Sequence, residues 1–233
     1  VNCKAKKVML EEVLYSYAFI FSIICSLIVS ITGFSLRKTG VQYRFLYLYP
    51  LASFLQNVLT LMIDQTDITK SQRNSIVGIS IYIFLLLEFY ILYHFFSHIL
   101  KNFKSRRFLN LIKWAYPILV LICWLPESNF NSCKYVLYLI QAALILFPSF
   151  IYIIGLVRNP LQVDIRYVPA FWITSGVFFY FATTMPFFLM KDYLFLTARG
   201  LDEGGIHSIN QLSYGIMFLL ILKGYKCCRK EIQ

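Results

Sequence analysis

Long apolar runs are the feature that most constrains this chain, because a helix that crosses about 30 Å of hydrocarbon needs roughly 17–25 mostly apolar residues. Seven stretches meet or approach that length. The strands of a membrane β-barrel would instead alternate apolar and polar residues over about ten positions. The sequence therefore predicts an all-α, polytopic transmembrane helix bundle with seven spans, at 13–34, 45–63, 76–100, 109–125, 135–157, 168–190 and 206–222. The fourth and seventh stretches are the shortest, so a bundle of six spans is the alternative.

Composition agrees with a chain whose main solvent is lipid. Hydrophobic residues make up 59% of the sequence and charged residues 14%, whereas soluble domains average about 45–50% and about 25%. The connections between the apolar stretches are short, and no linker or low-complexity segment separates them. We therefore expect residues 1–233 to form a single integral membrane domain with the lipid bilayer as its partner.

The basic residues predict an orientation in the membrane. The net charge is +11, but the lysines and arginines lie in short clusters between apolar runs, which argues against a nucleic-acid partner. With seven spans, 14 basic residues fall on the side of the C-terminus and 8 on the side of the N-terminus. Because basic loops accumulate in the cytoplasm, the N-terminus is expected outside and the C-terminus inside. The strongest markers are Lys101, Lys104, Arg106, Arg107, Lys223, Lys226, Arg229 and Lys230.

Glu88 is the one acidic residue inside a predicted span, and it lies at the midpoint of the third. A polar side chain at this depth must find a partner or a water-filled cavity. Desolvation favours the neutral form of such a carboxyl group. Two interpretations follow: a protonated carboxyl that bonds to a neighbouring helix, or a group that binds a ligand or a proton.

Other polar residues recur on helical faces that would look into the bundle. Tyr49, Ser53, Gln56 and Thr60 are spaced by three or four positions and share one face of the second span. Polar residues of the later spans lie at a similar depth, in the outer half. We therefore predict an outward-facing intramembrane cavity that ends near Glu88. Its candidate ligand-binding residues are Glu88, Gln56, Asn57, Gln141, Tyr180, Thr183, His207, Gln211 and Tyr214. Ordinary interhelical hydrogen bonding is the alternative for each of them.

The sequence gives little support for metal, cofactor or disulfide chemistry. His94 and His98 lie one turn apart, but the fragment lacks the intervening glutamate of a His-Glu-x-x-His zinc motif. We expect no metal and no cofactor. Cys3 and Cys133 would both face outside, so the compartment permits a disulfide between them. The sequence contains no phosphate-binding loop, nucleophile elbow or Cys-x-x-Cys pair.

Three segments carry a resemblance to a known group of proteins. They are Leu87-Glu88-Phe89-Tyr90, Phe171-Trp172-Ile173-Thr174-Ser175-Gly176, and Ile209-Asn210-Gln211-Leu212-Ser213-Tyr214 followed by a basic, Cys-containing end. The chain resembles small uncharacterised bacterial seven-helix membrane proteins that are often encoded near, or joined to, sensor histidine kinases. The resemblance implies a multi-pass sensor of the inner (cytoplasmic) membrane with a cytoplasmic kinase or regulator as partner. Without a kinase domain in this sequence, any output would pass through that partner.

Three classes of function stay open. The leading hypothesis is a non-enzymatic sensory or regulatory membrane protein for signal transduction, which binds a small ligand or a proton near Glu88. The first alternative is a small proton-coupled transporter, although the sequence shows no internal repeat. The second is an intramembrane lipid-modifying enzyme of the lysoplasmalogenase-like type. Such chemistry usually needs a second acid, or a histidine and an acid, at a common depth.

Overall fold

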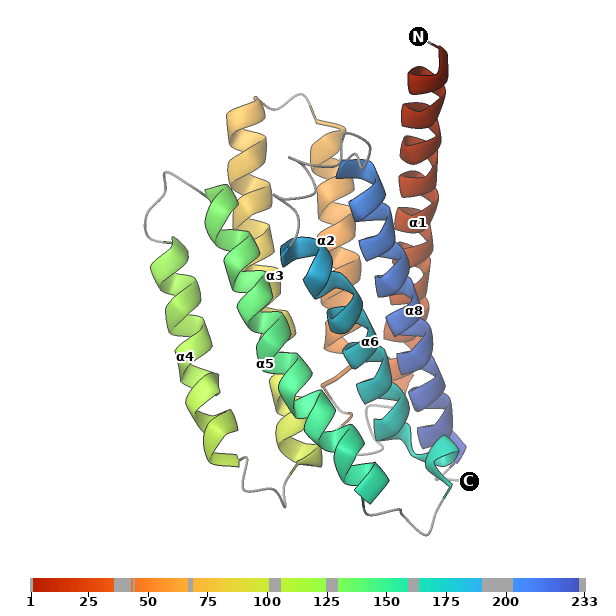
Figure 1. Ribbon diagram of the computed structural model, residues 1–233, viewed down its shortest axis with the longest axis vertical. Helices are drawn as coiled ribbons and strands as arrows, with labels where there is room; N and C mark the ends of the chain where they lie inside the picture. Colours follow the sequence, from red (N-terminus) through yellow and green to blue (C-terminus); the bar gives the residue numbers. More distant parts are fainter. Residues whose placement is uncertain are drawn as a thin grey trace.

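The computed structural model describes residues 2–35, 43, 45–66, 69–100, 106–124, 130–158, 164–189 and 203–230. Within these ranges the protein consists of seven α-helices and one short 3-10 helix, η2, with no strand (Figure 1). Their bounds are α1 Asn2–Ser35, α2 Leu48–Asp64, α3 Lys70–Ile99, α4 Arg106–Trp124, α5 Phe130–Arg158, η2 Ile165–Tyr167, α6 Pro169–Leu189 and α8 Glu203–Lys230. The predicted all-α architecture is therefore confirmed.

Four helices are long and apolar enough to cross a membrane: Val13–Ser35 of α1, Ser75–Ile99 of α3, Tyr135–Arg158 of α5 and Pro169–Leu189 of α6. Two shorter apolar helices lie at Leu48–Ile63 and Asn110–Cys123. α8 is not one of these four, and its first half carries polar side chains such as His207, Asn210 and Gln211. The chain thus has the helices of a membrane protein, whereas seven crossings and the orientation stay predictions.

Several helices continue past the apolar stretches that predicted them. α3 begins at Lys70, inside the predicted loop, and Thr69 before it has the extended backbone of a helix N-cap. The Thr69 hydroxyl lies 2.9 Å from the Gln72 side-chain oxygen. A Thr followed three positions later by Gln is a helix-start pattern. Hydropathy identifies only the apolar stretch of such a helix and not its polar ends. The orientation markers Lys101 and Lys104 lie outside the described residues.

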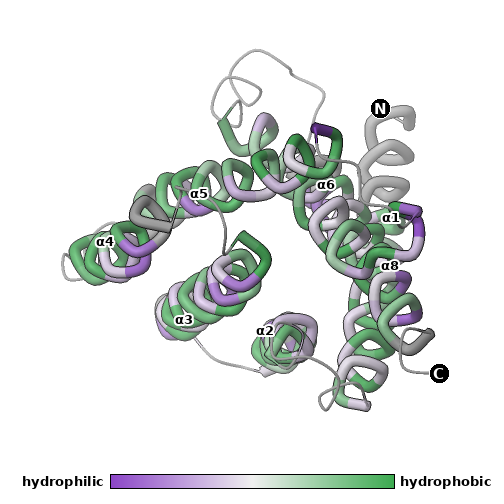
Figure 2. The backbone as a smooth tube through the Cα atoms, turned by 90° about the horizontal axis from the view of Figure 1, so that it is seen from below, coloured by the Kyte–Doolittle hydropathy of each residue, from purple (hydrophilic) through white to green (hydrophobic). Residues whose placement is uncertain are grey.

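Six of the seven described helices form a closed ring. α2 lies between α1 and α3, α3 contacts α5, α6 lies between α5 and α8, and α8 returns to α1 (Figure 2). α4 lies outside the ring and packs on α3 and α5. Its outer side chains Leu111, Trp114 and Ile118 are exposed, as expected for side chains that face lipid. The chain starts at one end of the bundle and finishes at the other (Figure 1).

Small residues bring α1 and α8 close together. Ser22, Ser26 and Ser30 of α1 are buried and recur every four residues, a spacing that lets two membrane helices approach. Gly33 continues this close packing, because a Cβ added there would lie 2.8 Å from the Cβ of Tyr47 and 2.7 Å from the ring of Tyr225. α8 therefore packs closely against α1.

Candidate functional site

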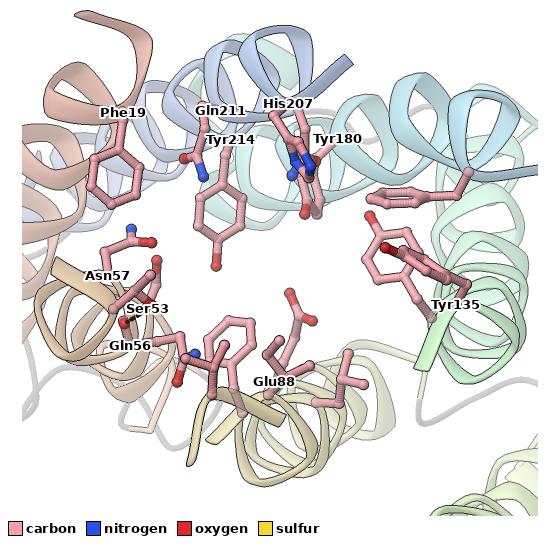
Figure 3. Close-up of a pocket in the computed structure, with 18 of the residues that line it drawn as sticks. Phe19, Ser53, Gln56, Asn57, Glu88, Tyr135, Tyr180, His207, Gln211 and Tyr214 are labelled. Atoms are coloured by element: carbon pink, nitrogen blue, oxygen red, sulfur yellow. Dashed lines mark hydrogen bonds between the residues drawn. The ribbon is translucent and has the colours of Figure 1, made fainter. Parts of the chain in front are cut away.

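A cavity of about 320 Å³ lies inside the ring of helices, in the half of the bundle where α3 and α8 begin. It extends from His207, which is exposed, to Glu88, which is 1% exposed. Its lining comes from α1, α2, α3, α5, α6 and α8. Figure 3 shows Glu88 of α3 and Tyr214 of α8 pointing into the cavity from opposite sides. In the part of the chain that the structure describes, the lining includes one acid and no lysine or arginine.

Glu88 is held by two side chains from other helices. The Tyr49 hydroxyl on α2 donates to Glu88 Oε1 at 2.8 Å, and Gln141 Nε2 on α5 donates to Oε2 at 2.7 Å. The Tyr116 hydroxyl on α4 in turn donates to Gln141 Oε1. Tyr49 and Gln141 are completely buried, and Glu88 and Tyr116 are 1% exposed. This network joins four helices, including the peripheral α4.

The hydrogen bonds around Glu88 suit a neutral acid. The Tyr49 hydroxyl has one proton and two acceptors within reach, Glu88 Oε1 at 2.8 Å and Met217 Sδ on α8 at 3.5 Å. If Glu88 carries its proton on Oε1, it donates to Tyr49, and the Tyr49 proton points to the sulfur. The three hydroxyl protons, on Tyr116, Glu88 and Tyr49, and one N–H of the Gln141 amide then each have an acceptor. A neutral acid also avoids the cost of an isolated charge in a low-dielectric interior.

Four polar atoms in the cavity lining are buried without a hydrogen-bond partner in the described part of the protein. They are Ser53 Oγ, Asn57 Nδ2, Asn210 Oδ1 and the Tyr214 hydroxyl oxygen. An unpartnered buried polar group costs about 1–3 kcal/mol. The set contains donors and acceptors from α2 and α8, on either side of the cavity. The cavity therefore offers unused hydrogen-bonding capacity that water or a ligand can satisfy.

The structure brings most of the predicted site residues together. Glu88, Gln56, Asn57, Tyr180, His207, Gln211 and Tyr214 all line the cavity. Gln141 lies behind Glu88 and holds it, and Thr183 is not among the lining residues. Two of the lining residues also make ordinary interhelical bonds, because Ser22 donates to Gln211 Oε1 at 2.7 Å and Gln56 donates to Ser80 at 3.0 Å. Whether the set binds a ligand stays a prediction.

Aromatic side chains form the part of the lining that the sequence did not indicate. They include Tyr15, Phe19, Phe84, Tyr135, Tyr138 and Phe188. The Tyr138 hydroxyl is 2.6 Å from Thr184 Oγ1, which links α5 to α6. Tyr138 precedes Gln141 by three positions, so the helical spacing alone places the two side chains on the same face of α5. Tyr116 had no such signal, because it lies on the one helix outside the ring.

The histidine pair and the cysteines lie apart from this site. His94 and His98 lie one turn apart on α3 with their rings edge to face, and their Nε2 atoms are 3.3 Å apart. Among the described residues no group of three or more histidines, cysteines, aspartates or glutamates has the geometry of a metal site. Cys133 is a free thiol, and the side chain of Cys3 lies outside the described residues.

The site combines a buried acid, aromatic walls and unpartnered polar atoms, which suits reversible binding of a small molecule more than bond-breaking chemistry. A general acid and base would need two titratable groups near a common reacting atom, and the lining supplies Glu88 at one end and His207 at the other. No family model, curated protein or solved structure matches the chain. The function proposed below therefore rests on the residues and geometry of this protein.

Proposed function

We propose that this protein is a membrane-embedded sensor that binds a small ligand or a proton beside Glu88 and signals through a cytoplasmic partner. The observation that carries the proposal is the cavity of about 320 Å³ that ends on a buried acid and four unpartnered polar atoms. That volume lies at the lower end of the range for small-molecule sites. With the predicted orientation, the cavity would open to the outside.

The lining favours a neutral or positively charged ligand with an apolar or aromatic body. Among the described lining residues there is no lysine or arginine to bind an anion, whereas Glu88 can accept a hydrogen bond from an ammonium group. Tyr180 and Tyr214 stand with ring centroids 4.8 Å apart. Such electron-rich ring faces attract cations and stack on flat apolar groups. A small aromatic amine fits this combination of charge, size and polarity.

α8 is the element best placed to carry a signal away from the cavity. Asn210 and Tyr214 line the cavity, and the same helix continues without interruption to Lys230 at the other end of the bundle. Met217 contacts the Tyr49 hydroxyl that holds Glu88. A ligand that rearranges these contacts can shift α8 as a unit, provided that it binds the two arrangements with different affinities.

The packing below Glu88 favours a sensor over a transporter. Leu92, Phe95, Phe96, Phe218 and Ile221 are all buried in one apolar cluster on the far side of the acid. A transported solute would have to pass this cluster. The resemblance to proteins encoded near sensor histidine kinases leads us to expect a kinase or a regulator as the cytoplasmic partner.

The test is binding of a matched series of probes to the purified protein in detergent: 2-phenylethylamine, 2-phenylethanol and phenylacetate. We expect the amine to stabilise the protein most in thermal unfolding and phenylacetate least. A bound ammonium group favours the ionised form of Glu88, and an amide cannot supply that charge. Glu88→Gln should therefore lower the amine affinity by at least about tenfold, because hydrogen bonds to charged groups contribute about 1.5–3 kcal/mol. Thr183→Val is the control, since Thr183 does not line the cavity. The proposal would be overturned if none of the probes bound and if cells that carry the Glu88→Gln variant responded to external amines as cells with the unaltered protein do.

A further inference from the structure

A second pocket lies at the other end of α8 and is basic. Arg166, Tyr167, Lys223, Lys226 and Cys227 line it, and its volume is about 320 Å³. We call it the basic pocket. It joins η2, just before α6, to the last turns of α8. It shares no lining residue with the Glu88 cavity, so an inference about it stands independently of the proposed function.

The backbone around the basic pocket is held by several specific contacts. The Asp164 side chain accepts from the Arg166 backbone N–H at 3.0 Å and thereby caps η2. The Arg166 carbonyl oxygen accepts from Trp172 Nε1 at 2.8 Å and from the Cys227 thiol at 3.6 Å. These bonds tie η2 to both α6 and α8. The pocket is therefore formed without a ligand.

The cations of the basic pocket outnumber the acids near them. Arg166 is paired with Asp164 at 2.7 Å, and this guanidinium lowers the pKa of the Asp164 carboxyl, which stays ionised. Lys223 and Lys226 are three residues apart on one face of α8. Neither lysine has a carboxylate within salt-bridge distance among the described residues. Counted over the described residues, the pocket therefore carries a net positive charge of about two.

Aromatic rings place the basic pocket at the level of lipid headgroups. Lys223 Nζ lies 3.5 Å from the centroid of the Trp172 ring, and Tyr167 is exposed beside it. Tryptophan and tyrosine collect at membrane interfaces because their rings are apolar and their tips polar. The apolar part of α8 ends at Leu222, directly before Lys223. In a bilayer that surrounds the apolar part of α8, the two lysines would lie at the level of the phosphate groups.

We propose that the basic pocket binds a phosphoryl group, supplied by an anionic phospholipid headgroup or by free phosphate. Two ammonium groups give point-charge contacts to phosphoryl oxygens, and Arg166 can add a hydrogen bond from a guanidinium nitrogen that Asp164 leaves free. Basic pockets between membrane helices bind acidic headgroups for the same reason. Each lysine near an anionic lipid surface is expected to contribute about fivefold to affinity, and the pair about 30-fold.

Trp172 provides the reporter for the test. With Trp114→Phe and Trp124→Phe, the protein keeps Trp172 as its single tryptophan, since the chain contains three. The protein is placed in phosphatidylcholine nanodiscs that contain a minor fraction of brominated phosphatidylglycerol or of brominated phosphatidylcholine. Bromine quenches nearby tryptophan fluorescence, so we expect stronger quenching by the brominated phosphatidylglycerol. Lys223→Ala with Lys226→Ala should abolish this preference, and Lys226→Gln should weaken it about fivefold without disturbing the Lys223–Trp172 contact.

The matched control uses the other interfacial lysine. Lys113 Nζ lies 5.4 Å from the centroid of the Trp114 ring, and neither residue lines the basic pocket. A single-Trp114 protein, with or without Lys113→Ala, should show no preference between the brominated lipids. Relief of quenching by millimolar inorganic phosphate identifies free phosphate as a second source and supports the site. Equal quenching of Trp172 by both lipids, unchanged in Lys226→Gln and unaffected by phosphate, overturns it.

Discussion

Replacing Glu88 tests the hydrogen-bond network at the base of the cavity. Glu88→Ala removes the bonds to Tyr49 and Gln141, which are 2.8 and 2.7 Å long. Side-chain hydrogen bonds between membrane helices contribute about 0.6 kcal/mol on average and about 1.7 kcal/mol at most. Two such bonds, plus the stranded Gln141 amide, predict a loss of about 2–3 kcal/mol. Because Glu88 borders the cavity, water can fill the vacated space, so we add no cost for an empty void.

Glu88→Gln should behave differently, because an amide can reproduce the bonds of a neutral acid. Its NH₂ group donates to Tyr49, whose proton goes to Met217 Sδ at 3.5 Å, and its oxygen accepts from Gln141. We expect this variant to lie within about 1 kcal/mol of the unaltered protein. Leu87→Ala, at the neighbouring half-exposed position, is the control.

The measurement is equilibrium unfolding by dodecyl sulfate in mixed micelles, followed by circular dichroism. The expected order of stability is unaltered protein, then Glu88→Gln, then Glu88→Ala. Equal losses for the two Glu88 variants would show that the acid is held as a carboxylate, contrary to the network described above. A Glu88→Ala variant as stable as Leu87→Ala would refute the structural role of the network altogether.

Three further predictions concern residues around this network and at the ends of the bundle. Gln141→Leu should cost about twice as much stability in the same assay as Tyr116→Phe, because it removes two hydrogen bonds instead of one; equal losses would contradict this. Gly33→Ala should destabilise by about 1–3 kcal/mol in that assay, since the new Cβ meets the Cβ of Tyr47 at 2.8 Å; an unchanged midpoint would contradict it. Arg166 lowers the pKa of Asp164 by hydrogen bonding, so that carboxyl stabilises the fold above its unfolded pKa and loses this contribution as pH falls. The melting temperatures of the unaltered protein and Asp164→Asn should therefore differ slightly at neutral pH and converge in acid, and a constant difference would exclude the effect.

The sequence predicted the helices and much of the cavity because both depend on local periodicity. A run of about twenty apolar residues has to be a helix in lipid, and polar residues three or four apart share a face whichever neighbour they meet. Glu88 stood out because it is a single acid in an apolar segment. The hydrogen-bond partners of such an acid have to come from other helices at the same depth.

The ring order was not predictable, because it depends on which helix faces meet. Nothing in the sequence places α4 outside the ring, so the bond from Tyr116 to Gln141 was missed. The basic pocket also escaped notice, since Arg166 and Lys223 are far apart in sequence and each looked like an orientation signal. Residues 101–105, 125–129, 159–163 and 190–202 are not described, so the predictions that fall on them stay open.

The partners of Glu88 reach the membrane at different times during synthesis. Tyr49 precedes Glu88 by 39 residues, whereas Gln141 follows it by 53. At roughly 5–20 residues per second, the ribosome needs roughly 3–10 s to make that later partner. When the nascent α3 carries Glu88 into lipid, α2 has already been made and can bond to the acid through Tyr49, whereas α5 has not yet been made. Tyr49 can aid the insertion of α3, while Gln141 can act only once α5 has entered the bilayer.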